Sequence, residues 1–424
     1  MAFRFIHTAD VHLDSPLRSL ALRNPELRDL IGTATRQAFE NTVQLCIDEE
    51  VDALLLAGDL YDGEQTSMKT ARFLGDQIRK LHECGIRVFI IRGNHDAESK
   101  ITKELVFPDT VKVFGSRADY VLIEQDSGQI PIVVHGISFA KPHAPESLLP
   151  KYKPPVAGAV NIGLMHSSLD GAPGHDVYAP CRLADLEQSG FRYWALGHIH
   201  KRVVHDGACM IVMPGIPQGR HVNESGPRSV SLVSISDDGD VRVEERFPFL
   251  AQFDRVRINV TGIEDWRDLA NRIEHTLTGL RDAAKAEHVV TRLQLAGTTP
   301  LAWRIRRDRD LLLTEAEERA NRIGSVWMEA LDTDCDVARI LDPVPGDPVS
   351  DLRDLIEGTL HQSDSFKFEA SEIAEDLIRQ LPPECRGFLG SDEHRFAEAI
   401  ADLSLSGAKD VLARLRSVSG KGED

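Results

Sequence analysis

Short apolar runs alternate with segments of helical periodicity over the first 250 residues of the chain. The runs at residues 3–6, 53–57 and 86–91 are continuous and short, which predicts buried strands. Between them, residues 33–50 and 66–83 place apolar side chains at helical spacing. Strands that alternate with helices predict β-α-β units. Other apolar runs predict strands at residues 111–114, 120–123, 130–134, 162–165, 193–196, 210–213, 230–235 and 241–243.

Helical segments become rarer after residue 110, where the pattern predicts one short helix around residues 184–189. The runs between residues 210 and 243 follow one another closely, as strands of an antiparallel set do. A mixed sandwich of two sheets fits this order better than one purely parallel sheet. We therefore expect residues 1–250 to form one α/β domain, a two-sheet sandwich flanked by helices.

The pattern changes near Pro248 and predicts a small α+β domain over residues 251–342. Its expected order is β-α-β-α-β, with strands at 253–260, 289–296 and 326–331 and helices at 265–286 and 314–322. Residues 303–307 (WRIRR) form the densest basic patch of the chain. A solvated edge strand or helix end and a contact with phosphate are both open for this patch.

Residues 343–424 are expected to be a linker followed by helices. Residues 342–348 are rich in proline, which is typical of a linker. Helical periodicity returns at 350–360, 369–381 and 393–415, with Ser371 and Ser391 as expected caps and a tail that frays after Ser417. These helices contain no cluster of catalytic or metal-binding residues. Two roles are therefore equally open for them: packing on the chain's own core and docking on a partner.

The composition is that of a soluble globular protein of 424 residues, with 42% hydrophobic and 27% charged residues. No apolar run approaches the roughly 20 residues of a membrane span, and the first residues lead into a strand rather than a signal peptide. We therefore expect a cytoplasmic protein without a membrane anchor. The six cysteines are scattered without a CxxC pair, which argues against a disulfide framework or a thiolate zinc site.

The net charge of −18 is unusual for a protein that binds nucleic acid, because contacts with phosphate normally draw on a basic surface. Ions bound by carboxylates in the first domain would neutralise part of this charge. The acidity therefore weakens a DNA-binding hypothesis without excluding it.

Side chains that can bind metal follow five of the predicted strands. Each cluster alone is a common loop sequence, but one ligand type at the same topological position in five segments is hard to ascribe to chance. The oxygen and nitrogen donors at these strand ends are Asp10, His12, Asp59, Asn94, His166, His198 and His200.

These donors exceed what one transition-metal ion uses, whereas two ions that share a carboxylate would take about four each. Asp59 is the natural bridge. His95, next to Asn94, is left without a metal and can act as general acid, and Asp62 can hold its imidazole in the required tautomer. Because these loops contain no Lys or Ser nucleophile motif, we expect direct attack by metal-bound water on a phosphoester.

The ordered motifs DxH, GDxxD, GNHD, a lone His and GHxH resemble those of the calcineurin-like metallophosphoesterases over most of residues 1–250. The resemblance implies a metallophosphoesterase fold and a catalytic His95 outside the metal shell. It also implies two ligand sets that share Asp59. One set is Asp10, His12, Asp59 and His200, and the other is Asp59, Asn94, His166 and His198.

The opening segment at residues 5–14 (FIHTADVHLD) is similar to the SbcD-type nuclease subunits of DNA repair, and residues 15–17 (SPL) and 214–220 (PGIPQGR) to their YhaO-type variant. This resemblance implies a Mn²⁺-dependent DNA exonuclease or endonuclease with a capping domain. It also implies an SMC-like ABC ATPase partner (SbcC-like or YhaN-like), and a homodimer stays open. The mixed ligand shell would also accept Fe, Zn or Co.

Two other functions remain open. The chain could hydrolyse a small phosphodiester or phosphomonoester, which its acidity favours, or it could serve mainly as a structural partner of an ATPase with a weak site. Among the remaining polar residues, we expect His7 to pack beneath the site. Arg220, His221 and Glu224 lie in a loop rich in glycine and proline that can line a substrate groove.

Overall fold

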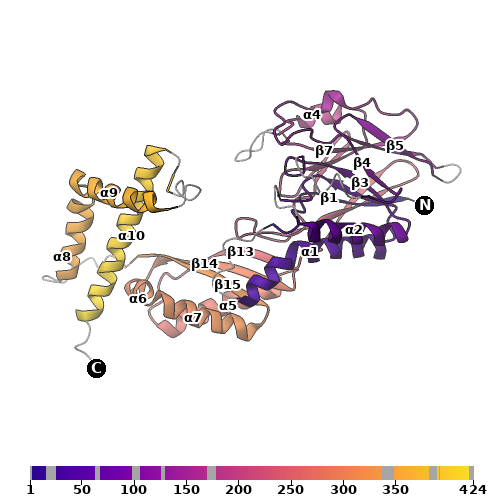
Figure 1. Ribbon diagram of the computed structural model, residues 1–424. Coiled ribbons are helices and arrows are strands. Elements are labelled where there is room, and N and C mark those ends of the chain that lie inside the picture. The colour runs from indigo at the N-terminus through magenta and orange to yellow at the C-terminus, as the bar shows by residue number, and fades with distance from the viewer. Residues whose placement is uncertain are drawn as a thin grey trace. The chain divides into compact units, whose positions relative to one another are not determined.

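Figure 1 shows the computed structural model, which describes residues 2–15, 25–62, 67–97, 106–125, 129–169, 178–336, 348–381, 389–390 and 392–419. Three predictions concern residues outside these ranges: most of the linker at 342–348, the cap at Ser391 and the end of the tail. The chain divides into two compact units. The first comprises Met1–Arg255, Leu280–Thr291 and Ser325–Glu329, and the second comprises Val256–Gly279, Arg292–Gly324 and Ala330–Asp424.

The first sheet has the strand order β12-β11-β1-β2-β3-β4. Its strands are β1 (Phe3–Thr8), β2 (Ala53–Ala57), β3 (Arg87–Ile91), β4 (Val111–Val113), β11 (Val230–Ile235) and β12 (Val241–Arg246). Strands β1 to β4 are parallel, β11 pairs antiparallel with β1, and β12 pairs antiparallel with β11. The carboxyl ends of β1, β2 and β3 therefore lie at one edge of the sheet.

The second sheet has the order β5-β6-β7-β8-β10-β9. It contains β5 (Asp119–Ile123), β6 (Ile132–Gly136), β7 (Val160–His166), β8 (Tyr193–Gly197), β9 (Val203–Asp206) and β10 (Met210–Met213). Strands β6, β7, β8 and β10 are parallel, and the edge strands β5 and β9 run antiparallel to them. The predicted two-sheet sandwich is thus confirmed, and β9 is a strand that the hydrophobic pattern did not predict.

The two sheets and their helices form four layers, because successive side chains of a strand point to opposite faces. On β2, Leu55 packs between the two sheets, whereas Leu54 and Leu56 pack toward helices α1 (Pro25–Asp48) and α2 (Met68–Glu83). On β8, Trp194 faces the short helix α4 (Leu183–Glu187) on the other side of the second sheet. Figure 1 shows α1 and α2 below one sheet and α4 above the other. A 3-10 turn (Leu149–Lys151) precedes β7.

His7 joins the two sheets through buried hydrogen bonds. Its Nδ1 lies 2.9 Å from the hydroxyl of Tyr193, and its Nε2 lies 3.1 Å from the carbonyl oxygen of Leu196. Burial lowers the pKa of His7 to about 3, so the ring is neutral at physiological pH. His7 is therefore a neutral core residue on β1 that contacts β8.

Helix α1 begins at Pro25, earlier than the periodicity predicted. Proline fits the first turn of a helix because its missing N–H has no partner there in any case. Leu27 and Ile31 are buried one turn apart, together with Val222 and Phe253. The early start is therefore stabilised by packing on residues that lie far away in the sequence.

Replacement of Gly32 with alanine is expected to stabilise the protein by about 0.5–1 kcal/mol. Gly32 lies in the interior of α1, is exposed, and has no heavy atom within 4 Å of the position of an added Cβ. Alanine loses less conformational entropy on folding and meets no obstacle here. Chemical denaturation of both proteins measures the difference, and an unchanged or lower free energy of unfolding would contradict it.

The segment after residue 250 contains a three-stranded sheet of order β13-β14-β15, with strands β13 (Ala251–Asn259), β14 (His288–Thr298) and β15 (Val326–Asp336). Its helices are α5 (Trp266–Ala283), α6 (Ala302–Arg307) and α7 (Arg309–Ile323). The predicted order of elements is present: the second predicted helix lies within α7, and α6 is an additional short helix before it.

The basic patch at residues 303–307 forms most of α6, so it is a helix and not an edge strand. Arg306 donates to Asp410 at 2.8 Å, and Arg307 donates to Asp308 through two bonds of 2.7 Å. The guanidinium of Arg304 lies 4.5 Å from the ring centre of Trp266. Much of the patch therefore contacts other side chains of the protein.

The C-terminal helices are α8 (Pro348–Leu355), which continues into a π-helical turn (Ile356–Leu360), α9 (Asp364–Gln380) and α10 (Glu393–Ser419). Ser371 is not a cap: it lies inside α9, whose N-cap is Ser363, with its side chain accepting from Phe366 N at 3.2 Å. The helical periodicity predicted a start for α9 that is too late, because most side chains in the first turn of α9 are exposed and add no apolar signal. Within the described ranges, no helix is both long and apolar enough to cross a membrane.

Candidate metal centre

The predicted ligands follow the carboxyl ends of β1, β2, β3, β7 and β8, as the sequence indicated. His166 is the last residue of β7, and the others lie in the loops that follow the strands. Backbone hydrogen bonds hold two of these loops together: Asp10 N donates to Gly58 O at 2.9 Å and His12 N to Asp59 O at 3.1 Å.

The backbone at several of these positions is left-handed. Asp10, His12 and Asp59 have φ angles of 53°, 45° and 52°, and His198 has 102°. Such angles cost free energy for residues other than glycine and persist only where the surrounding structure enforces them. The concentration of this strain at predicted ligands indicates a functional site.

Two carboxylates and a histidine form the centre of the cluster. Ligand atoms of Asp10, Asp59 and His166 all lie within 4.8 Å of one another, and the three residues are buried. His166 Nε2 is 3.3 Å from Asp59 Oδ2 and 3.0 Å from Asn94 Oδ1. The ring of His198 has its centre 5.2 Å from that of His166, and His198 N donates to Asp10 Oδ2 at 2.9 Å.

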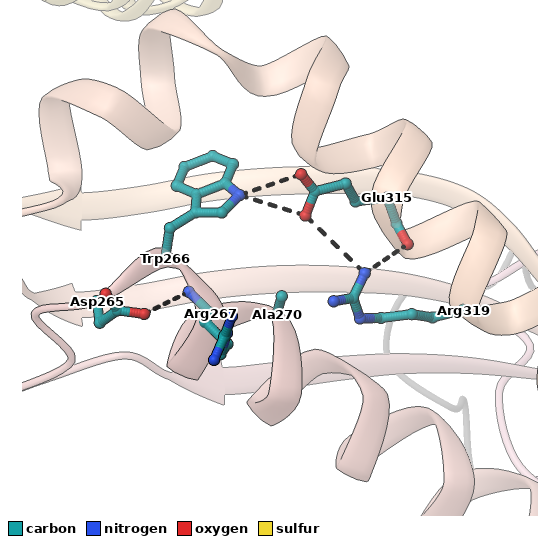
Figure 2. Close-up of a pocket in the computed structure, with 6 residues that line it drawn as sticks. All are labelled: Asp265, Trp266, Arg267, Ala270, Glu315 and Arg319. Carbon is teal, nitrogen blue, oxygen red and sulfur yellow. Dashed lines mark hydrogen bonds and ion pairs between the residues drawn. The ribbon is translucent and has the colours of Figure 1, made fainter.

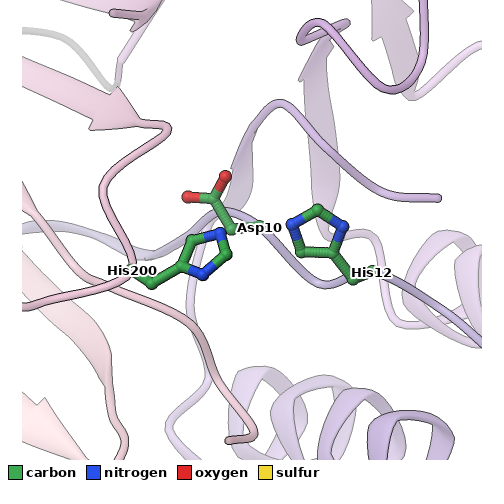
Figure 3. Close-up of side chains that lie close together, drawn as sticks. All are labelled: Asp10, His12 and His200. Atoms are coloured by element: carbon green, nitrogen blue, oxygen red, sulfur yellow. The ribbon is translucent and has the colours of Figure 1, made fainter. Parts of the chain in front are cut away.

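Asp10 also belongs to a second group with His12 and His200, again with ligand atoms within 4.8 Å of one another. Figure 3 shows these three side chains converging, with one ring nitrogen of each histidine directed toward the carboxylate of Asp10. The structure thus brings all seven predicted ligands into one region.

His95 and Asp62 lie beside this region. His95 Nδ1 is 3.4 Å from Asp62 Oδ1, and the ring centres of His95 and His12 are 5.0 Å apart. The side chain of His95 is 39% exposed, whereas that of His12 is 1% exposed. His95 is therefore the histidine of this pair that solvent and a substrate can reach.

Three supporting residues were missed or misplaced by sequence reasoning. Ser15 donates to Asp62 Oδ2 at 2.8 Å. Asp96 accepts from three backbone amides of the two loops that carry Asp59 and Asn94: Leu60 at 3.1 Å, Tyr61 at 3.0 Å and Gly93 at 3.3 Å. Glu224 does not line an open groove, because it is buried with its carboxylate 2.8 Å from His200 Nδ1. Only Asp96 had a sequence signal, its place in the GNHD motif.

Comparison with known proteins shows the family of the chain. Residues 3–202 match the family described as calcineurin-like phosphoesterase. The metallophosphoesterase YhaO of Bacillus subtilis is 31% identical over 390 residues, which are 89% of this chain and 94% of that protein. The chain belongs to the calcineurin-like metallophosphoesterase family. Residues 253–336 of this metallophosphoesterase also match the middle domain of YhaO.

Two further proteins are similar to the chain at lower sequence identity. The DNA double-strand break repair protein Mre11 of Methanocaldococcus jannaschii is 25% identical over 288 residues, which are 64% of this metallophosphoesterase and 73% of Mre11. The crystal structure of a dimetal phosphatase from Danio rerio aligns over 58% of this chain and 96% of its own, with 12% identity and a TM-score of 0.35. This TM-score is too low to indicate a common fold by itself.

The donors fit divalent metal ions. Both ring nitrogens of His12 are buried, and neither has a hydrogen-bond partner among the described residues. His166 Nδ1 is held by the carbonyl oxygen of Ala57 at 2.9 Å and His200 Nδ1 by Glu224, which leaves Nε2 of each toward the carboxylates. Outward hydrogen bonds of this kind are typical of histidines that bind metal. Carboxylate, imidazole and amide donors suit manganese, iron, zinc or cobalt.

The electrostatics of the centre favour positive charge. Burial alone would lower the pKa of His166, but the carboxylates of Asp59 and Asp10 raise it to about 9. Burial and the negative charge of Asp59 raise the pKa of Asp96 to about 7. Burial would also raise the pKa of Asp59, but His166 holds it below its ordinary value. Several buried carboxylates in contact need a cation to balance them.

A hollow of about 600 Å³ is lined by Asp265 and by residues of α5 and α7 (Figure 2). Trp266 Nε1 donates to both carboxylate oxygens of Glu315 at 3.2 Å, and Arg319 pairs with Glu315 and with Glu274. Among the described residues, the groups that could hold a metal ion do not include any lining residue of this hollow. Its charged side chains therefore serve to hold α5 against α7.

Proposed function

We propose that this metallophosphoesterase is a DNA nuclease that hydrolyses phosphodiester bonds with two divalent metal ions. The proposed metal is Mn²⁺. The observation that carries the proposal is an accessible histidine, His95, beside a buried cluster of metal-binding side chains. The similarity to proteins described as DNA break repair proteins supports DNA as the substrate. The proposed ligand sets are those predicted from the sequence, with Asp59 as the bridge.

Two bound ions would supply an activated water and would hold two oxygens of the phosphoryl group. The chain's own residues carry out the remaining tasks. His95 donates a proton to the departing oxygen, and Asp62, itself held by Ser15, fixes the His95 ring through Nδ1. Asp96 holds together the two loops that carry Asp59 and Asn94.

The test is a cleavage assay with Mn²⁺ on single- and double-stranded DNA of defined 3′ and 5′ ends. Release of nucleotides from one end, together with the metal content of the same sample, gives substrate, direction and stoichiometry. Intact DNA, with the protein alone and with its ATPase, would refute the nuclease proposal. Hydrolysis of bis-p-nitrophenyl phosphate without cleavage of DNA would favour the small-substrate alternative, which the net charge of −18 supports.

We propose in addition that the C-terminal helices dock on the coiled coil of an SMC-like ABC ATPase. Many of the exposed large apolar side chains of the protein lie on these helices, and α9 has no buried residue. On α9, Phe366, Ala370, Ile373 and Leu377 recur at intervals of three and four, the spacing of a helix that packs on other helices. The exposed large apolar side chains on these helices are Leu355, Leu360, Phe368, Ile373, Leu377, Leu403, Val411 and Leu415.

Replacing both Ile373 and Leu377 with aspartate is expected to abolish binding to the ATPase and to leave hydrolysis by the isolated protein unchanged. Ile373 is 72% exposed and Leu377 57%, so the change does not disturb a core. Glu372→Lys on another side of α9 is the control. Equal binding of the double variant and the control would refute docking through this face, and concentration-dependent dimers lost in the double variant would show that a second copy covers it.

A further inference from the structure

Two charged side chains compete for Nδ1 of His200. Glu224 Oε1 lies 2.8 Å from this nitrogen, and Arg220 Nη2 lies 3.3 Å from it. A carboxylate can only accept a hydrogen bond and a guanidinium can only donate one, so the two contacts require opposite tautomers of the ring. The shorter contact, with Glu224, determines the tautomer of His200. Arg220 Nη2 does not need Nδ1 as an acceptor, because it already donates to Glu224 Oε1 at 3.1 Å. His200 therefore carries its proton on Nδ1.

This tautomer leaves a lone pair on Nε2. In Figure 3 the ring nitrogen of His200 that lies nearer Asp10 is the one remote from the chain, Nε2. Asp10, His12 and His200 offer ligand atoms within 4.8 Å of one another. The proton on Nδ1 thus makes the other nitrogen available at the place where the three donors converge.

Glu224 is itself fixed in place. Its Oε2 accepts from Arg220 N at 2.7 Å, and its own backbone N donates to His221 O at 2.8 Å, so the loop closes on itself. The side chains of Glu224 and Arg220 are 8% and 16% exposed. Arg220 Nη2 also donates to Glu224 Oε1 at 3.1 Å, and this charged partner favours the ionised carboxylate of Glu224.

We propose that Glu224, braced by Arg220, is a positioning residue that holds His200 in the metal-binding tautomer and so sets the affinity of one of the two metal positions. That position is the one bounded by Asp10, His12 and His200. The other position is bounded by Asn94, His166 and His198, whereas the carboxylate of Glu224 is held by His200 and Arg220. The inference rests on the proposed two-metal site and not on the identity of the substrate.

The first experiment reads the tautomer directly. Nitrogen-15 NMR of histidine-labelled, metal-free protein is expected to show His200 protonated at Nδ1, and a mixture of tautomers in Glu224→Ala. Glu224→Gln should keep the wild-type tautomer, because its amide oxygen still accepts from Nδ1. An Nε2-protonated His200 in the wild type, or an unchanged tautomer in Glu224→Ala, would overturn the inference.

The second experiment measures affinity by calorimetric titration of metal-free protein with Mn²⁺. Glu224→Ala is expected to weaken one binding event about 10–100-fold and to leave the other unchanged. Arg220→Ala should have a smaller effect of the same kind. Glu245→Ala is the matched control, because Glu245 also pairs with a half-buried arginine, Arg202, at 3.0 Å.

The outcomes separate this inference from the proposed function. Equal weakening of both binding events, or none, would overturn the role of Glu224. If Glu224→Ala fails to fold, as circular dichroism would show, Arg220→Ala replaces it as the test, and an unchanged affinity in that variant would overturn the inference. Wild-type protein that binds two ions but leaves DNA intact would remove only the proposed substrate, whereas wild-type protein that binds a single ion would overturn both.

Discussion

Replacement of His95 with alanine is expected to lower the rate of phosphodiester hydrolysis by about 10²–10⁴-fold, the usual contribution of general acid catalysis. His95 lies beside the metal-binding cluster, is accessible, and has Asp62 3.4 Å from its Nδ1. Loss of its proton leaves the departing alkoxide without a donor, whereas the seven proposed ligands remain. Steady-state rates with DNA and metal content by elemental analysis measure the two effects separately.

The control for this variant is His82→Ala. The His82 side chain has the same exposure as that of His95, 39%, but it lies in the last turn of α2, which leads to the opposite end of β3. Asp62→Asn should fall between the control and His95→Ala, because it weakens the hold on the ring without removing it. Hydrolysis that survives in His95→Ala with full metal content would refute the role of His95 as general acid.

The position of the site could be predicted because it depends on topology. Asp10, Asp59 and Asn94 follow consecutive parallel strands, and the carboxyl ends of such strands meet at one edge of the sheet. The hydrophobic pattern alone therefore brings them together, without any knowledge of loop conformation.

The residues that support the ligands could not be predicted in the same way. Ser15 meets Asp62 and Glu224 meets His200 only because the intervening loops take particular conformations, several of them with left-handed φ angles. A sequence pattern carries no signal for such pairs. The early start of α1 has a similar cause, since Leu27 and Ile31 pack on Val222 and Phe253, which the local periodicity does not include.

Replacement of Gly93 with alanine is expected to weaken metal binding and to lower activity by about 10²-fold, although Gly93 is not a ligand. A Cβ at this position would lie closer than 3.0 Å to Asp59 Oδ1 and to His166 Cε1. Neither neighbour can move freely: Asp59 Oδ1 accepts from His95 N at 3.0 Å, and His166 is held by Ala57 at 2.9 Å. The loop or the proposed bridging carboxylate must therefore shift. Mn²⁺ titration and hydrolysis rates measure the result.

Gly115→Ala separates this effect from the general cost of adding a methyl group. Gly115 also lies in a loop after a strand, but an added Cβ there would have no heavy atom within 4 Å. Overpacking at Gly93 should also reduce the free energy of unfolding by about 1–3 kcal/mol, whereas Gly115→Ala should leave it nearly unchanged. Wild-type metal affinity in Gly93→Ala would contradict the prediction, and a crystal structure of the variant would then show whether Asp59 or the loop has moved. A displaced Asp59 together with wild-type affinity would refute its proposed role as a ligand that both ions share, because such a ligand could not move away without weakening the binding of both.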